Sequence, residues 1–214
     1  MQVTRIIAVR HGETAWNVDT RIQGQLDIPL NETGRWQAQR LARALAASEQ
    51  IDAIYTSDLL RAWDTAQSIA QAVGLPTVME PGLRERGFGQ FQGKTFTELE
   101  AHWPAETARW RERDPHWAPP EGETLLQVRE RVERAAHELA RRHLGGQIVL
   151  VAHGGVLDAL YRCAARLDIR APRTWTLGNA SINRLLWTPE GMTVVGWADT
   201  AHLEEDAPRD EETA

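Results

Sequence analysis

The chain has 214 residues, of which 42% are hydrophobic and 25% are charged, and its formal net charge is −6. This length and composition are typical of a protein with a full hydrophobic core and exclude collagen-like, low-complexity and mostly disordered chains. The longest apolar runs, such as residues 148–152, are too short to span a bilayer. Cys163 is the only cysteine and residues 1–5 show no signal segment, so we predict a cytoplasmic protein without membrane contact or internal disulfide.

The negative charge is concentrated at the C-terminal end. Residues 203–214 contain six acidic side chains and one arginine, so the rest of the chain is close to neutral. We predict a solvated acidic tail at 203–214 that follows a single domain at 1–202. A near-neutral domain also lacks the basic surface that nucleic acids require, and we expect no nucleic-acid partner.

Predicted strands and helices alternate along the chain. Short β-branched apolar runs predict strands at 4–9, 51–56 and 147–152. Apolar residues at helical spacing predict helices at 31–48, 58–73, 124–143 and 156–167. The second of these helices has Ser57 or Asp58 as its expected N-cap. Near the end of the chain, strands at 181–187 and 192–198 are expected to form a hairpin.

This alternation predicts an α/β fold of three layers, in which helices flank a mostly parallel sheet. Residues 81–123 interrupt the pattern, because they are rich in glycine, proline and tryptophan. We expect them to form a lid-like insertion over one end of the sheet. Within it, Trp103, Trp110 and Trp117 recur every seven residues, which favours one packed helix face over a ligand-binding stack.

Two histidines and two arginines follow the predicted parallel strands. Arg10 and His11 end the first strand, Arg61 lies in the first turn after the second, and His153 ends the third. Open α/β sheets bind ligands at the carboxyl ends of their strands, so these four side chains should meet at one edge. A neutral imidazole is a nucleophile near neutral pH, and guanidinium groups suit phosphate or carboxylate. Any one of these side chains could be an ordinary surface residue, but their convergence favours an anion-binding site with chemistry.

Longer motifs surround these side chains. They read Arg10-His11-Gly12-Glu13-Thr14, Ser57-Asp58-Leu59-Leu60-Arg61-Ala62, Leu83-Arg84-Glu85 and His153-Gly154-Gly155-Val156. Together they resemble the histidine phosphatase superfamily, which includes the cofactor-dependent phosphoglycerate mutases, and the resemblance covers about residues 4–198. One departure is Phe91-Gln92, where many members have Trp-Glu.

The resemblance implies a phosphoglycerate mutase-like fold and a role for each site residue. His11 would attack the phosphorus of a phosphomonoester to form a phosphohistidine, and Glu85 would protonate the leaving alkoxide. Arg10, Arg61 and His153 would neutralise the phosphoryl oxygens. The implied phosphate-binding set is Arg10, Asn17, Gln23, Gly24, Arg61, His153 and Gly154. This scheme needs no metal ion and no organic cofactor, and the expected partner is a small-molecule phosphate ester.

Three activities fit these motifs. The favoured one is a metal-independent phosphomonoester hydrolase that acts on small phosphorylated metabolites. The alternative is a phosphoglycerate mutase, which would use 2,3-bisphosphoglycerate as cofactor. A third, less favoured because the motif residues are intact, is an inactive protein that binds phosphorylated ligands.

Two sequence features favour the phosphatase branch over the mutases. The mutases that resemble this chain carry an extra segment of arginines and prolines before the last strand of the parallel set, and this chain lacks it. They also tend to have Asn where this chain has Gly155. We expect residues 81–123 to determine the substrate, while the oligomeric state stays open.

Overall fold

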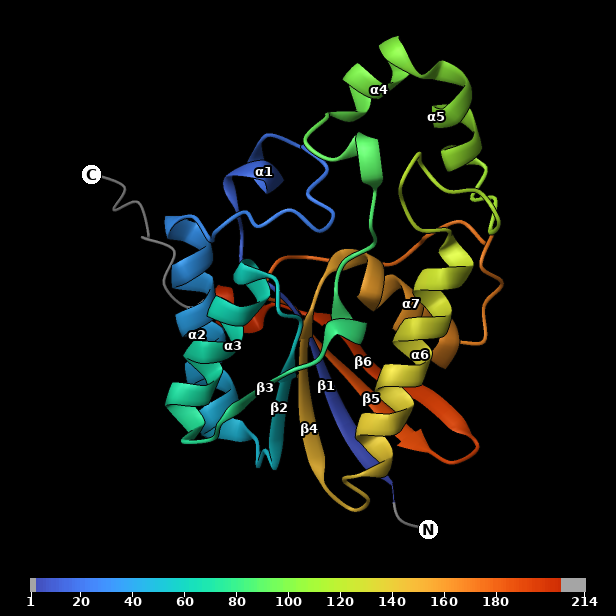
Figure 1. Ribbon diagram of the computed structural model, residues 1–214. Coiled ribbons are helices and arrows are strands. Elements are labelled where there is room, and N and C mark those ends of the chain that lie inside the picture. Colours follow the sequence, from blue (N-terminus) through green and yellow to red (C-terminus); the bar gives the residue numbers. More distant parts are fainter. Residues whose placement is uncertain (1–2, 205–214) are drawn as a thin grey trace, which may run out of the picture.

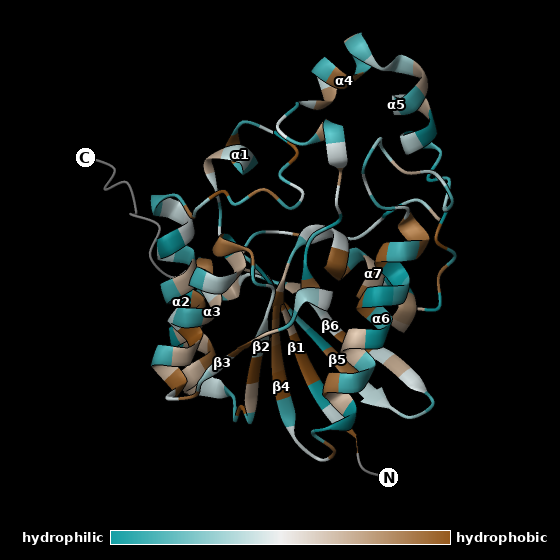
Figure 2. Ribbon diagram, viewed as in Figure 1, coloured by the Kyte–Doolittle hydropathy of each residue, from teal (hydrophilic) through white to brown (hydrophobic). Residues whose placement is uncertain are grey.

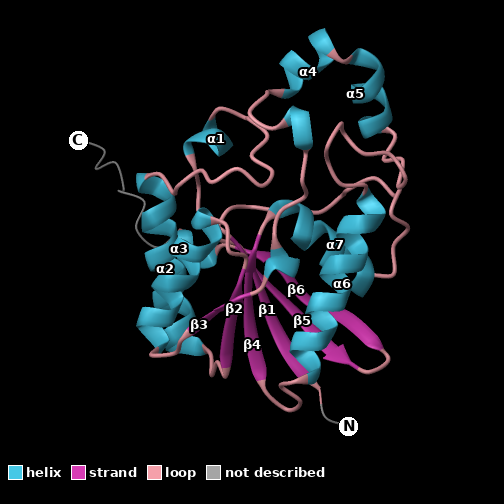
Figure 3. Ribbon diagram, in the orientation of Figure 1, coloured by secondary structure: helices cyan, strands magenta, loops and turns pink. Residues whose placement is uncertain are grey.

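The computed structural model describes residues 3–204, which form a six-stranded sheet between two layers of helices (Figures 1 and 3). The strand order is β3-β2-β4-β1-β5-β6. The strands are β1 (Thr4–Arg10), β2 (Ala53–Thr56), β3 (Thr77–Met79), β4 (Gln147–Ala152), β5 (Ile182–Thr188) and β6 (Gly191–Asp199). The first four are parallel, and β5 and β6 extend the sheet as an antiparallel hairpin. The predicted α/β fold with a mostly parallel sheet is confirmed.

Helices cover both faces of the sheet. On one face lie α2 (Glu32–Ser48) and α3 (Leu60–Val73), and on the other lie α6 (Leu125–Arg141) and α7 (Gly154–Ala164) (Figure 1). All six residues of β4 are buried, because both faces of a central parallel strand are covered. Figure 2 shows the resulting apolar centre of the sheet. The three predicted layers are therefore present.

The edge strand β3 is not predicted by the sequence pattern. It has only three residues, and Val78 and Met79 are 47% and 52% exposed. A strand that is neither long nor buried lacks the apolar run by which the others are recognised.

The ends of two helices differ from the prediction. The residue before α3 is Leu59, which makes no side-chain cap, so the expected Ser57 or Asp58 cap is wrong. Asp58 instead accepts hydrogen bonds from the guanidinium of Arg84. The helix α7 begins at Gly154, two residues earlier than predicted, directly after the extended backbone of His153. The caps of α2 and α6, by contrast, are Asn31 and Thr124, at the predicted starts.

The insertion at 81–123 lies over the carboxyl ends of the parallel strands and contains α4 (Phe96–His102) and α5 (Pro104–Arg111) (Figure 1). It has its own small core around Phe91, whose ring lies 5.9 Å from that of Trp103, 5.9 Å from that of Trp110 and 6.1 Å from that of Trp117, centroid to centroid. The three tryptophans therefore pack in a core, as expected. They do not share one helix face, because only Trp110 lies within a helix.

No helix within the described range 3–204 is long and apolar enough to cross a membrane. Of the predicted acidic tail, Leu203 and Glu204 end the described range, where Leu203 closes a short 3₁₀ turn (Ala201–Leu203). The remaining tail residues, 205–214, lie outside the described residues.

Candidate active site

The predicted nucleophile and its neighbours meet at the carboxyl edge of the sheet. β1 pairs with β4, and β4 with β2, in parallel register up to this edge. His11 follows β1, Arg61 lies in the first turn of α3, and His153 immediately precedes α7. The structure thus brings together side chains that are up to 142 positions apart in the sequence.

His11 is buried and held in one tautomer. Its Nδ1 lies 2.7 Å from the carbonyl oxygen of Gly12, which only accepts hydrogen bonds, so Nδ1 carries the proton and Nε2 carries the lone pair. The Nε of Arg61 donates to this Nε2 at 3.3 Å. Arg61 is itself fixed by donating to the carbonyl oxygens of Leu26 and Gly24, at 2.8 and 2.7 Å. The Nε2 of His11, the predicted nucleophile, therefore faces a rigidly placed cation.

Both histidines of the site are neutral before a substrate binds. Burial lowers the pKa of His11 well below its ordinary value of 6.5, and the charges of Arg61 and Arg10 lower that pKa further. Burial and the same arginines also hold the pKa of His153 well below 6.5, and the ring centroids of the two histidines lie 5.2 Å apart. Burial lowers the pKa of Arg61 to about 10, so it stays cationic at neutral pH. A neutral imidazole beside a permanent cation is a suitable nucleophile for an anionic ester.

Several buried polar atoms around His11 have no hydrogen-bond partner within residues 3–204. They are the Nε of Arg10, both ring nitrogens of His153 and the Oε1 of Gln23. Buried polar atoms are normally satisfied, so the unpartnered nitrogens mark a position for a ligand. Guanidinium and imidazole N–H groups suit phosphoryl oxygens. Over the same range, no group of three or more His, Cys, Asp or Glu side chains is arranged to hold a metal ion.

Glu85 lies against the N-terminus of α7. The backbone N–H of Gly155 lies 3.1 Å from both of its carboxylate oxygens, and the N–H of Arg86 donates to Oε1 at 2.7 Å. A methyl group built on Gly154 would lie 3.9 Å from Oε2 of Glu85 and 3.9 Å from Cζ of Arg10. The carboxyl group of Glu85 and the guanidinium of Arg10 therefore border the same space, as expected of the predicted acid and one of the predicted phosphate-binding residues.

Two side chains fasten the loop that carries Glu85. Gln25 and Arg131 each donate to its backbone carbonyl at 3.0 Å. Arg131 also donates two hydrogen bonds of 2.8 Å to Glu123. None of these supporting residues is predicted from the sequence. A polar residue on a helix face or in a loop has the same sequence pattern whether it is exposed to solvent or bonded to a site loop.

The other predicted phosphate-binding residues, Asn17 and Gly24, make hydrogen bonds that position their neighbours. Thr14 is the N-cap of the one-turn helix α1 (Ala15–Val18), and Asn17 completes the capping box by accepting from the N–H of Thr14 at 3.0 Å. Asn179, which is not predicted, links His11 and Asn17 by donating to the backbone oxygen of His11 and to Oδ1 of Asn17, at 3.0 and 3.3 Å. The carbonyl of Gly24 positions Arg61, as described above.

The departure from the family pattern at Phe91-Gln92 leaves the site intact. Phe91 forms the centre of the small core in the insertion. The Oε1 of Gln92 accepts from the backbone N–H groups of Gln25 and Phe88, at 2.9 and 3.3 Å. A neutral amide oxygen thus connects the loop near Gly24 to the insertion.

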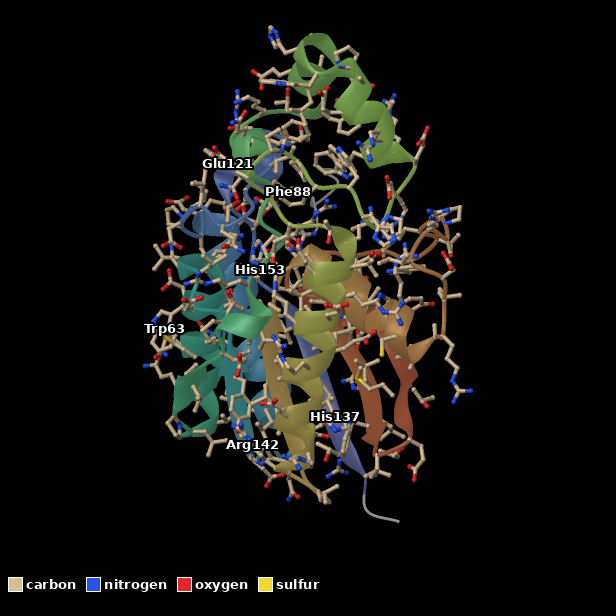
Figure 4. All side chains as sticks on the ribbon, turned by 45° about the vertical axis from the view of Figure 1, so that its right-hand side comes forward. Trp63, Phe88, Glu121, His137, Arg142 and His153 are labelled. Carbon is tan, nitrogen blue, oxygen red and sulfur yellow. The ribbon has the colours of Figure 1, made fainter. Side chains whose placement is uncertain are left out.

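A cleft of about 400 Å³ opens beside Glu85. The insertion contributes Phe88 and Trp110 to it, α7 contributes Asp158, and the loop between α7 and β5 contributes Arg173. Figure 4 shows Phe88 above His153, on the side of the insertion. The cleft is therefore lined by the insertion, which is predicted to determine the substrate, and also by the loop before β5, for which no such role is predicted.

The lowered histidine pKa values predict how stability depends on pH. Below pH 6.5 the unfolded chain binds protons at His11 and His153 while the folded chain does not, so stability should fall on acidification. Each histidine should contribute a slope of about 1.4 kcal/mol per pH unit between its folded and unfolded pKa values. Chemical denaturation of the wild type and of His153→Gln just below pH 6.5 tests this, and equal slopes for the two proteins would contradict it.

Substituting alanine for Gly155 should displace Glu85, the predicted acid, and leave the protein folded. A Cβ at this position would lie 2.3 Å from Oε1 of Glu85, and the flexible carboxylate end would have to move. Gly155→Ala should lower turnover of alkyl phosphates by about 10²-fold, the typical cost of misplacing a catalytic group. The control is Gly196→Ala in β6, whose Cβ meets nothing closer than 4.0 Å. Unchanged turnover in a folded Gly155→Ala protein would refute the contact.

Comparison with known proteins matches residues 6–200 to the histidine phosphatase superfamily (branch 1). A metal-independent phosphoserine phosphatase of Arabidopsis thaliana is 39% identical over 204 residues, which cover 94% of this chain and 84% of that protein. A glucosyl-3-phosphoglycerate phosphatase of Mycobacterium tuberculosis is 38% identical over 200 residues, which cover 88% of this chain and 89% of that protein. A probable phosphoglycerate mutase GpmB of Cronobacter sakazakii is 36% identical over 212 residues, or 95% and 96% of the two chains.

Solved structures agree with this match. The structure of Bacillus stearothermophilus YhfR superposes with a TM-score of 0.87 at 32% identity, and the alignment covers 94% of this chain and 100% of that chain. Sequence and fold therefore point to the same group of proteins.

Proposed function

Because this chain belongs to the histidine phosphatase superfamily, branch 1, we propose that it hydrolyses phosphomonoesters of small metabolites through a phosphohistidine at His11. The observation that carries the proposal is the geometry around His11. A neutral, buried imidazole presents its lone pair beside nitrogens of Arg10 and His153 that have no partner within residues 3–204. Two relatives that are named as phosphatases support hydrolysis as the reaction.

In the first step the phosphoryl group moves to the enzyme. The Nε2 of His11 attacks phosphorus, a P–N bond forms and the ester P–O bond breaks. Arg10, Arg61 and His153 stabilise the charge on the non-bridging oxygens. Glu85 gives its proton to the leaving oxygen, so that an alcohol departs.

In the second step water takes the phosphoryl group. Glu85, now a carboxylate, accepts a proton from water as the water oxygen attacks phosphorus. The P–N bond breaks, inorganic phosphate leaves, and His11 and Glu85 return to their starting protonation states. One carboxyl group thus serves as acid and then as base.

Hydrolysis of p-nitrophenyl phosphate, with and without EDTA, tests the proposed function. We expect turnover with release of inorganic phosphate, and equal rates in the presence of the chelator. No turnover would favour the inactive ligand-binding protein, and loss of activity with EDTA would contradict the metal-independent scheme.

The mutase alternative is supported by the relative named as a probable phosphoglycerate mutase. It would use 2,3-bisphosphoglycerate to charge His11, whereas the phosphatase needs no such cofactor. Supplying 3-phosphoglycerate with catalytic 2,3-bisphosphoglycerate separates the two, because a phosphatase releases phosphate faster than it forms 2-phosphoglycerate. Isomerisation that far outruns phosphate release would overturn the proposal. The cytoplasmic location and the absence of any further partner stay predictions from the sequence.

A further inference from the structure

The cleft beside Glu85 has more positive than negative side chains. Arg10, Arg86, Arg113 and Arg173 line it, against Glu85 and Asp158. A cleft lined mainly by one sign of charge concentrates ligands of the opposite sign. One of the four arginines, Arg10, is assigned to the phosphoryl group. The other three are candidates to bind the rest of the substrate.

Two of these three guanidinium groups are already engaged by the protein. Arg86 donates to the backbone oxygens of Glu123 and Trp117, at 2.9 and 3.5 Å. Arg113 donates to the backbone oxygen of Ile169 at 3.0 Å and to Asp158 at 3.0 Å. Both guanidinium groups therefore hold the lining of the cleft together through bonds within the protein.

Arg173 differs from the other arginines of the cleft. It is exposed, and its side chain has no hydrogen-bond or ion-pair partner within residues 3–204. Burial is the main cause that lowers the pKa of Arg10 and of Arg113, and the positive charge of Arg173 lowers both further. The Arg173 guanidinium thus repels those of Arg10 and Arg113, and a second anion on the ligand would relieve that repulsion.

The carboxylate of Asp158 is held by two arginines other than Arg173. Its Oδ2 accepts from Arg113 at 3.0 Å and from Arg162 at 2.8 Å. Its Oδ1 is buried and has no hydrogen-bond partner within residues 3–204. Both hydrogen bonds to Asp158 therefore come from other side chains, and this carboxylate does not hold the Arg173 guanidinium.

We propose that Arg173 is a specificity-determining residue that binds a carboxylate of the substrate, so that the preferred substrates are phosphorylated organic acids. This inference rests on the proposed phosphatase function. The phosphoryl group lies at His11 and Arg10, and the acid group of the same molecule reaches the free guanidinium at the cleft mouth.

A pair of small esters isolates the carboxylate. 3-Phosphoglycerate and glycerol 3-phosphate differ only in a carboxylate against a hydroxymethyl group, and phosphate release from each is followed. The wild type should prefer 3-phosphoglycerate in kcat/KM by about tenfold or more, since a hydrogen bond between charged groups is typically strong enough for that ratio. Arg173→Gln should reduce this preference about tenfold, mainly by raising KM for 3-phosphoglycerate, because the contact is present in ground and transition states alike.

Arg170→Gln is the matched control, since Arg170 is an exposed arginine of the same loop that does not line the cleft. We expect it to leave both substrates unchanged. No preference for the carboxylate, or equal effects of the two substitutions, would overturn the role of Arg173 while glycerol 3-phosphate and p-nitrophenyl phosphate are still hydrolysed. A wild type that hydrolyses none of these esters would instead refute the proposed function.

Discussion

Replacing His11 with alanine should lower turnover of p-nitrophenyl phosphate on the order of 10⁵-fold or more, the scale found when an enzyme loses its nucleophile. The reason is that no other side chain at the site is held in a fixed tautomer with its lone pair beside a cation. The proton of His11 is fixed on Nδ1 by Gly12, and its Nε2 faces the cation of Arg61. His153, the nearest alternative, has neither ring nitrogen fixed by a partner within residues 3–204.

The variant should remain folded, which circular dichroism and thermal unfolding would check. His11 is buried but uncharged, because its single ring proton is on Nδ1, so its loss removes no buried charge. The control is His137→Ala, because His137 is an exposed histidine on α6 that lies well below His153 in Figure 4. We expect full activity from it. A folded His11→Ala enzyme with more than a trace of turnover would show that another residue is the nucleophile.

Changing Glu85 to glutamine should slow the hydrolysis of alkyl phosphates by about 10²- to 10⁴-fold, the usual contribution of general acid catalysis. Glutamine keeps the shape of the side chain and an oxygen for the N–H of Gly155, but it has no acidic proton. The effect on p-nitrophenyl phosphate should be much smaller, because p-nitrophenolate leaves without protonation. Steady-state rates with glycerol 3-phosphate and p-nitrophenyl phosphate measure the difference.

Glu121→Gln provides the control for this substitution. Glu121 is an exposed carboxylate of the same insertion, labelled in Figure 4. It should leave both substrates unaffected. Equal losses on both substrates in Glu85→Gln would mean that Glu85 does not protonate the leaving group.

The central part of this fold is readable from the sequence because its strands are buried on both faces. Residues 148–152 of β4 form a continuous apolar run, and the bounds of β4 match the prediction of 147–152. The positions of Arg10, His11, Arg61 and His153 then follow from one rule, that parallel strands present their carboxyl ends at one edge. Local pattern and topology agree there.

Other features depend on contacts that no local pattern records. The α3 cap prediction fails because Asp58 is engaged by Arg84, a residue of the distant Glu85 loop. Asn179 joins Asn17 to His11 across more than 160 positions of sequence. The free guanidinium of Arg173 becomes informative only when its neighbours in the cleft are seen to be engaged. Each of these features is a tertiary contact, and neither composition nor residue spacing predicts such contacts.

Locating the phosphoryl group on the enzyme tests the central claim most directly. The wild type is mixed with a phosphate-labelled ester, quenched in alkali during turnover, digested and mapped by mass spectrometry. We predict one acid-labile, alkali-stable label, on His11, which forms and decays as fast as the enzyme turns over. A label on His153 or on any other residue, or full turnover without a labelled protein, would contradict the account.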